Sequence, residues 1–367
     1  MSGMGTHTPY SIERFRQANG PVVDVRSPAE FNKGHWPGAI NLALFSDEQR
    51  AAVGITYKKK GRQQAIKLGL EFTGPKLSSL GEALAKLSRD PTTESEATTS
   101  APDLRIYCWR GGMRSASVAW LAGLLDLNPV LLEGGYKSYR RWVLQQFEQT
   151  WPLRLLGGRT GTGKTDLLIA MAQRGVAVVN LEGLANHRGS SFGGLGLPPQ
   201  PSTEHYENLL AEDLQRCQNS SADEIWLEAE SSQVGRCRIP RALFHQMQMA
   251  PVLEINRSLD ERVAQLVDVY GQHGRESLQE ATQRISRRLG PQRTRQALDA
   301  IALENWDQAC RAMLDYYDRC YDYELSRTPQ RQSVDLCGLN TTKAAEMLIE
   351  RELVRSSPKP QLVMSST

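Results

Sequence analysis

A cysteine in a loop rich in glycine and arginine is the first feature that could do chemistry. Residues 108–115 read Cys-Trp-Arg-Gly-Gly-Met-Arg-Ser, between an apolar run and a helical pattern. Glycines let successive backbone N–H groups converge on one anion, and a helix N-terminus adds its positive dipole end. Such a setting favours a nucleophilic thiolate at Cys108 over a buried structural thiol. We predict that Arg114 assists Cys108 and that the anion loop comprises Trp109, Arg110, Gly111, Gly112 and Met113.

A phosphate-binding pattern lies some fifty residues further along the chain. Residues 158–165 read Gly-Arg-Thr-Gly-Thr-Gly-Lys-Thr, a full G-x4-G-K-[ST] match between a predicted strand and a predicted helix. In this motif, backbone amides hold a diphosphate, the lysine reaches its outer oxygens and the last hydroxyl contacts Mg²⁺. The predicted phosphate-binding residues are Gly158, Gly161, Thr162, Gly163, Lys164 and Thr165, with Thr165 as the Mg²⁺ contact.

Two glutamates follow the apolar run 225–227, where a carboxylate near the metal usually lies in phosphate-loop proteins. They are Glu228 and Glu230, and neither is the aspartate that is most typical there. Two solvated acids are the alternative interpretation.

The first half of the chain resembles the rhodanese domain over residues 11–149. The resemblance rests on residues 24–31 (DVRSPAEF), 34–41 (GHWPGAIN) and 133–136 (EGGY), together with the Cys108 loop. It implies persulfide-type chemistry on Cys108. Five residues separate Cys108 from Arg114, whereas many single-domain rhodaneses have four. Protein tyrosine phosphatases share the longer spacing and are the alternative, although Trp109 and the glycine pair that follows Arg110 favour a rhodanese.

The order of a rhodanese domain and then a phosphate loop resembles the tRNA 2-selenouridine synthase family. Residues 50–58, 181–193, 228–231 and 287–290 are also typical of that family, and Asn180 departs from it where an aspartate is expected. The resemblance implies that geranyl diphosphate alkylates the sulfur of a 2-thiouridine at the tRNA wobble position. Selenium from selenophosphate then replaces the S-geranyl group through Cys108. No cofactor is expected to be tightly bound, and Mg²⁺ is a candidate ligand at the phosphate loop.

This chemistry favours the phosphate loop as a clamp for the diphosphate of the geranyl donor, with ATP binding as the alternative. The candidate substrate-binding residues are Glu182, His187, Arg188, Glu228 and Glu230. For His187 and Arg188, a polar loop packed against the phosphate site is the plainer interpretation. Two other functions stay open, namely a sulfurtransferase coupled to a phosphate-loop NTPase and a non-catalytic tRNA-binding protein with a nucleotide switch.

Three basic runs suggest contact with tRNA on a chain that has 44 basic and 41 acidic residues. The first lies at residues 58–62, the second at 137–141 beside three aromatic side chains that could stack on bases, and the third at 284–295. Charge runs are usually solvated surface, so these are candidates only. The candidate tRNA-binding residues are Lys58, Lys60, Arg140, Arg141, Arg287 and Arg288.

The elements that position these motifs follow an alternation of apolar runs and helical patterns. Strands are expected at residues 21–25, 104–108 and 130–133, then at 152–156, 176–181, 225–227 and 252–255. This alternation predicts an α/β fold with parallel sheets. We expect a rhodanese-like domain over residues 1–150 and a phosphate-loop NTPase-like domain over 151–330, helical from about 258. A C-terminal tail over 331–367 and a surface insertion at 90–103 complete the expected organisation.

Composition limits the compartment and the class of protein. The net charge is +3, and 40% of the residues are hydrophobic, as in globular domains. The six cysteines are scattered without a Cys-x-x-Cys pair, which disfavours a disulfide framework or a zinc site. No apolar run is long enough to span a membrane, and the N-terminus lacks the features of a secretion signal. We therefore expect a cytoplasmic protein. We also expect it to be a monomer.

Overall fold

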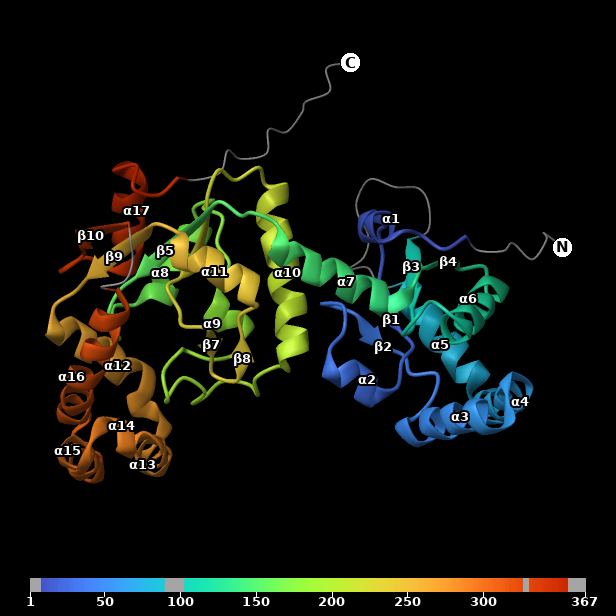
Figure 1. Ribbon diagram of the computed structural model, residues 1–367, viewed down its shortest axis with the longest axis horizontal. Helices are drawn as coiled ribbons and strands as arrows, with labels where there is room; N and C mark the ends of the chain where they lie inside the picture. The colour runs from blue at the N-terminus through green and yellow to red at the C-terminus, as the bar shows by residue number, and fades with distance from the viewer. Residues whose placement is uncertain (1–7, 90–101, 326–329, 356–367) are drawn as a thin grey trace, which may run out of the picture. The chain divides into compact units, whose positions relative to one another are not determined.

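Two parallel sheets, one in each half of the chain, carry the two motifs in the computed structural model (Figure 1). The structure describes residues 8–89, 102–325 and 330–355. The chain divides into unit 1, residues 1–145, and unit 2, residues 146–367, with the division falling inside helix α7. Most of the predicted insertion at 90–103, and the chain from residue 356, lie outside the described residues. The predicted α/β fold is confirmed in both units.

Unit 1 alternates short strands with helices. Its elements are α1 (Ile12–Gln17), β1 (Val22–Asp24), α2 (Pro28–Lys33), β2 (Ile40–Asn41), α3 (Asp47–Lys60), α4 (Arg62–Thr73), η1 (Gly74–Lys76), α5 (Leu77–Ser88), β3 (Asp103–Tyr107), α6 (Met113–Leu124), β4 (Asn128–Leu131) and α7 (Gly135–Glu148).

The sheet of unit 1 has the order β2-β1-β3-β4, and all its pairs are parallel. Strands β1 and β3 are central and lie next to each other, although the chain runs from β1 to β2 first. A ligand site in such a sheet forms where the strand order reverses, beyond the carboxyl ends of the strands. Cys108 directly follows β3 and Arg26 follows β1, so both lie at this switch point. The core behind them includes Val23, Leu84, Leu104, Ile106 and Val118.

Unit 2 begins with a second parallel sheet and continues into a group of helices. Its elements are β5 (Leu153–Gly157), α8 (Lys164–Ala172), α9 (Leu181–Leu184), α10 (Thr203–Asn219), β6 (Ile225–Glu228), β7 (Gln233–Val234), β8 (Cys237–Arg238), α11 (Arg241–Met249), β9 (Val252–Asn256), α12 (Leu259–Tyr270), η3 (Gly271–His273), α13 (Arg275–Arg284), α14 (Ser286–Leu289), α15 (Pro291–Ala302), α16 (Trp306–Leu325), β10 (Arg331–Asp335) and α17 (Thr341–Glu350).

The parallel sheet of unit 2 has the order β10-β9-β5-β6, which corrects the prediction of a C-terminal tail from residue 331. Strand β10 pairs with β9 along its whole length. Helix α17 then buries Ala344, Ala345 and Leu348 against the core of the sheet. Residues 331–335 are four polar residues and one valine, so no apolar run indicated this edge strand.

The expected strand at residues 176–181 is also wrong. In this segment only Val178 forms a bridge, to Trp226 of β6, and the chain then turns into the short helix α9. Asn180, the departure from the family pattern, caps α9 through its side-chain oxygen, which accepts from the Gly183 amide at 2.6 Å.

The predicted helical region after residue 258 forms its own apolar core beside the sheet. Ser258 and Glu261 form a capping box that starts α12. Helices α13 to α16 bury Leu278, Leu289, Ile301 and Met313, together with Ile285 between α13 and α14 and Phe192 from an earlier loop. Among the described residues, no helix combines the length and apolar character needed to cross a membrane.

Candidate active sites in the two units

The Cys108 loop joins β3 to the N-terminus of α6, as the sequence predicts. Cys108 is buried, with 3% of its surface exposed. Its sulfur accepts a hydrogen bond from the Gly112 amide at 3.3 Å and lies 3.2 Å from the Ser115 hydroxyl. An amide and a hydroxyl at this range can both stabilise negative charge on the sulfur. The loop therefore places a buried thiol, with two hydrogen-bonding groups around its sulfur, at a helix N-terminus.

The segment that follows β4 holds the Cys108 loop in place through backbone hydrogen bonds. The amide of Tyr136 donates to the Cys108 carbonyl at 2.8 Å, and that of Lys137 donates to the Trp109 carbonyl at 3.0 Å. Gly135 has a φ of +60°, and a Cβ there would overlap the backbone of Cys108 and Gly111. The second glycine of the EGGY pattern is therefore required by this close approach of two backbones.

A buried ion pair lies beneath the same loop. Arg26 donates to both oxygens of Asp24, and neither side chain has any exposed surface. The Arg26 guanidinium also lies 3.7 Å from the centre of the Tyr136 ring. Burial and stacking of this kind hold the DVR segment rigidly against the segment that supports Cys108.

Arg114 is paired within the protein rather than left free for an anion. Its two terminal nitrogens lie 2.6 and 3.3 Å from the oxygens of Glu30 on α2. Burial by itself would raise the pKa of Glu30, but hydrogen bonds and the charge of Arg114 outweigh it and lower that pKa. This contact holds the start of α6 against α2 and so orients the anion loop.

Breaking this pair should cost stability in a pH-dependent way. Arg114→Ala should lower the free energy of unfolding by about 1.5–3 kcal/mol at neutral pH, because a half-buried carboxylate loses its charged partner. Since the pKa of Glu30 is lowered on folding, this contribution is present above the ordinary carboxyl pKa. It is lost as pH falls through the folded value. Urea unfolding of wild type and variant at neutral pH and at about pH 3 measures the difference in their free energies of unfolding. A difference that does not change with pH would contradict this prediction.

The phosphate loop of unit 2 lies between β5 and α8, again at the predicted position. The ammonium group of Lys164 donates to the Gly158 carbonyl at 2.7 Å, so it spans the loop opening. Gly161 and Gly163 have positive φ, which turns the loop amides inward. Strand β5 lies between β9 and β6, so this loop also occupies a switch point of its sheet.

Three glutamates that the sequence proposed for substrate binding gather at this loop. The Thr165 hydroxyl donates to Glu182 at 2.5 Å, and the Leu181 amide donates to Glu228 at 2.9 Å. Glu228 is fully buried, which excludes the solvated alternative for it. Burial, followed by the negative charge of Glu182, raises the pKa of Glu228 to about 8, and the pKa of Glu230 is raised for the same reasons.

His187 and Arg188 lie on the loop that covers these carboxylates. His187 Nδ1 is buried and has no hydrogen-bond partner among the described residues, and burial lowers the pKa of this histidine. Arg188 donates to the Leu195 carbonyl at 2.9 Å, and its guanidinium lies 5.9 Å from the Tyr270 ring centre. In this structure Arg188 thus packs within the loop, whereas His187 offers an unused nitrogen.

Gly189 allows that loop to approach the carboxylates. Its φ is +65°, and a Cβ there would lie 2.9 Å from an oxygen of both Glu182 and Glu230. Gly189→Ala should therefore destabilise unit 2 by about 1–3 kcal/mol and weaken binding of diphosphate. Gly194→Ala in the same loop is the control, because its Cβ meets only an ordinary contact. Urea unfolding and calorimetric titration with inorganic diphosphate measure both effects; equal behaviour of the two variants would contradict this role.

The sequence motifs did not reveal two arginines that hold the phosphate loop. Arg262 is buried on α12, pairs with Asp318 at 2.5 Å and donates to the Thr160 carbonyl at 2.8 Å. Arg257 donates to the Thr162 carbonyl at 3.2 Å. The capping box at Ser258 is a local signal that a helix starts here, but nothing in the sequence indicates which loop these side chains contact.

Comparisons with known proteins cover both units. Residues 151–350 match the family described as "tRNA 2-selenouridine synthase AAA domain", and residues 11–141 match the rhodanese-like domain. Proteins named tRNA 2-selenouridine synthase from Sulfurovum sp. (strain NBC37-1) and from Marinobacter nauticus are 36% and 35% identical to this chain. The match with the Sulfurovum protein covers 85% of this chain and 91% of that protein. The match with the Marinobacter protein covers 84% of this chain and 89% of that protein. The chain belongs to the tRNA 2-selenouridine synthase family.

Membership of the tRNA 2-selenouridine synthase family confirms the resemblance drawn from the motifs, and it identifies the chain as an enzyme. A solved structure, described as the N-terminal domain of an ATP/GTP binding protein from Clostridium difficile 630, is 35% identical to this chain. It covers 37% of this chain and 99% of its own length, with a TM-score of 0.34.

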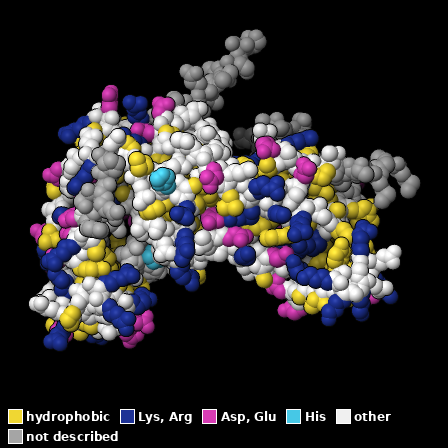
Figure 2. Space-filling view, in the orientation of Figure 1, with side chains coloured by type: hydrophobic (Ala, Val, Ile, Leu, Met, Phe, Trp, Pro, Cys, Tyr) yellow, Lys and Arg dark blue, Asp and Glu magenta, His cyan; other side chains and the backbone are white. Residues whose placement is uncertain are grey.

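The basic residues predicted to contact tRNA in this family member lie mainly on the surface. Lys58 and Lys60 are exposed at the end of α3, and Arg287 and Arg288 are exposed on α14. Arg141 is exposed as well, while Arg140 is half-buried. On the face shown in Figure 2, Lys and Arg side chains gather on unit 1 over β1 and α3.

The aromatic residues beside Arg140 cannot stack on tRNA bases as the sequence suggested. Tyr136 and Tyr139 have no exposed surface, and Trp142 has only 9%. Tyr139 instead stacks on Trp36 with ring centres 4.2 Å apart. These side chains face inward because α7 uses them to cover the sheet, so this part of the prediction was wrong.

The residues around Thr165 fit Mg²⁺ only in part. The hydroxyl of Thr165 and the carboxylate of Glu182 are oxygen ligands of the kind that Mg²⁺ prefers. In the described part of the chain, however, no three His, Cys, Asp or Glu side chains form a metal-binding group. A bound Mg²⁺ would thus take its remaining ligands from phosphate oxygens and water, which is usual for this ion.

Proposed function

We propose that this enzyme converts 2-thiouridine at the wobble position of tRNA into 2-selenouridine in two half-reactions, one at each motif. The observation that supports this most strongly is the presence of both motifs at sheet switch points in a chain whose relatives carry that name. A nucleophilic cysteine and a diphosphate clamp are the two devices that the reaction needs. We also propose a cytoplasmic location, because the tRNA substrate is available there.

The first half-reaction is S-geranylation at the phosphate loop. The thiocarbonyl sulfur of the base attacks C1 of geranyl diphosphate, so that a carbon–sulfur bond forms and the carbon–oxygen bond to diphosphate breaks. Lys164 and the loop amides stabilise the negative charge that builds up on the leaving diphosphate. Mg²⁺ held by Thr165 and Glu182 would supply further positive charge there.

The second half-reaction replaces the S-geranyl group with selenium. S-alkylation makes the base a cationic isothiourea, whose C2 accepts selenium while geranylthiol leaves with one proton. Cys108 attacks the phosphorus of selenophosphate, so that a sulfur–phosphorus bond forms, the selenium–phosphorus bond breaks and selenide is released to attack C2. Water then hydrolyses the sulfur–phosphorus bond and restores the Cys108 thiol. Overall, one water molecule supplies the proton of the thiol and the hydroxyl of the phosphate, so no oxidant or reductant is consumed.

The test is to run the half-reactions separately with purified protein and to analyse tRNA nucleosides by mass spectrometry. With geranyl diphosphate alone, the product should be S-geranyl-2-thiouridine. With selenophosphate added, it should become 2-selenouridine. Selenophosphate alone should leave 2-thiouridine unchanged, and conversion without geranyl diphosphate would overturn the proposed order of steps.

A further inference from the structure

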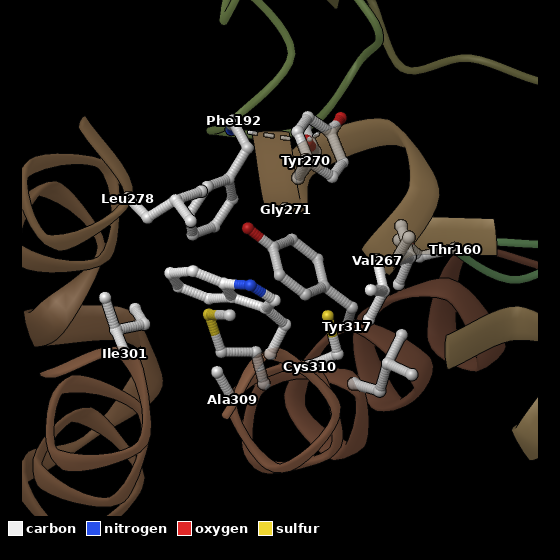
Figure 3. A pocket seen from close by; sticks show the side chains of 15 residues that line it. Thr160, Phe192, Val267, Tyr270, Gly271, Leu278, Ile301, Ala309, Cys310 and Tyr317 are labelled. Carbon is white, nitrogen blue, oxygen red and sulfur yellow. Dashed lines mark hydrogen bonds between the residues drawn. The ribbon is translucent and has the colours of Figure 1, made fainter. Parts of the chain in front are cut away.

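An apolar cavity of about 50 Å³ lies in unit 2 next to the phosphate loop (Figure 3). It is lined by residues of α12, α13, α15 and α16 and of the loop that carries Ser190 and Phe192. Figure 3 shows the Tyr317 ring extending into its centre and Phe192 lying above it. The lining contains no charged side chain. Its wall includes the aliphatic side chains of Val267, Leu278, Ile301, Ala309 and Met313.

The cavity shares a wall with the site that we assign to diphosphate. Thr160, the third residue of the phosphate loop, lies in the lining beside Val267 of α12. Helix α12 is in direct contact with the loop, because Arg262 donates to the Thr160 carbonyl at 2.8 Å. Ser190 and Phe192 come from the loop that also covers Glu182. An organic chain that is attached to a diphosphate in the phosphate loop and extends to this side would therefore contact an apolar surface.

We propose that this cavity binds the distal isoprene unit of a prenyl diphosphate whose phosphates lie in the phosphate loop. The inference rests on the proposed function, since that supplies the donor. At about 10–15 Å³ per water-sized group, the cavity accommodates roughly four such groups, close to one five-carbon unit. A nucleobase is too large for this cavity.

The size of the cavity should determine which length of prenyl chain the enzyme prefers. A ten-carbon donor places its second isoprene unit in the cavity, whereas a five-carbon donor does not reach it. Loss of that apolar contact should weaken binding of dimethylallyl diphosphate roughly 100-fold relative to geranyl diphosphate. A fifteen-carbon donor exceeds the space unless a lining side chain is shortened.

The test compares two identical substitutions on α16. Cys310 lines the cavity, whereas Cys320 is exposed on the same helix and does not. Cys310→Phe should raise the KM for geranyl diphosphate at least about tenfold, and Cys320→Phe should leave it unchanged. Titration with inorganic diphosphate should give wild-type affinity for both variants, which shows that the phosphate loop is intact. Ile301→Ala, which enlarges the cavity, should improve use of farnesyl diphosphate relative to geranyl diphosphate.

The outcomes separate this inference from the proposed function. Wild-type KM and unchanged chain-length preference in both Cys310→Phe and Ile301→Ala would overturn the cavity assignment while leaving geranylation standing. The converse outcome is wild-type protein that transfers no prenyl group yet binds geranyl diphosphate more tightly than inorganic diphosphate. If Cys310→Phe removes that difference, the cavity assignment holds and the proposed reaction fails.

Discussion

Cys108→Ala should abolish formation of 2-selenouridine and leave S-geranylation intact. Only the second half-reaction requires a nucleophile that breaks the selenium–phosphorus bond, and the buried sulfur at the N-terminus of α6 is placed for it. In the variant, S-geranyl-2-thiouridine should accumulate, because the first half-reaction proceeds without consumption of its product. Mass spectrometry of tRNA nucleosides after incubation with both donors measures the two products together.

The control is the same substitution at another cysteine. Cys337 is exposed in unit 2, so Cys337→Ala should behave as wild type in both half-reactions. Full 2-selenouridine formation by Cys108→Ala would remove the assigned role. Loss of both products would point to a folding defect, which a thermal unfolding curve of the variant would reveal.

Lys164→Ala should impair S-geranylation and spare selenation, which is the opposite of the effect expected for Cys108→Ala. The variant lacks the full positive charge that faces the leaving diphosphate, so geranylation should fall by about 10²–10³-fold. Selenation of tRNA supplied already S-geranylated should continue, because that step uses Cys108 and no diphosphate. Lys164→Arg, which keeps the charge, should recover part of the rate. The exposed Lys343 on α17 provides the matched alanine control.

The same experiment separates the diphosphate clamp from an NTPase. An ATP-driven movement would make both half-reactions depend on ATP, and Lys164→Ala would then impair both. Each half-reaction is therefore run without and with ATP. Normal geranylation by Lys164→Ala would reject the clamp, and an absolute ATP requirement would establish the nucleotide alternative.

The two motifs could be located from the sequence because each is a continuous strand–turn–helix segment. In residues 108–115 and 158–165, glycines and the following helix determine the loop conformation with little help from elsewhere. The apolar runs likewise predicted most central strands, since strands buried on both faces need continuous apolar residues. The position of Glu228 directly after such a run was enough to select it as a candidate site residue. The sequence did not indicate that its side chain is completely buried.

The tertiary structure decided what each charged or aromatic side chain near the motifs contacts. Glu30 is 84 residues from Arg114, and Arg262 is 102 residues from Thr160, yet each pair is in hydrogen-bond contact. Residues 137–142 show basic and aromatic types, but only the packing of α7 on its sheet turned the aromatic rings inward. Strand β10 is mostly polar because it lies at an edge, so no apolar run marked it. Such contacts depend on how distant elements pack, and local residue patterns do not contain that information.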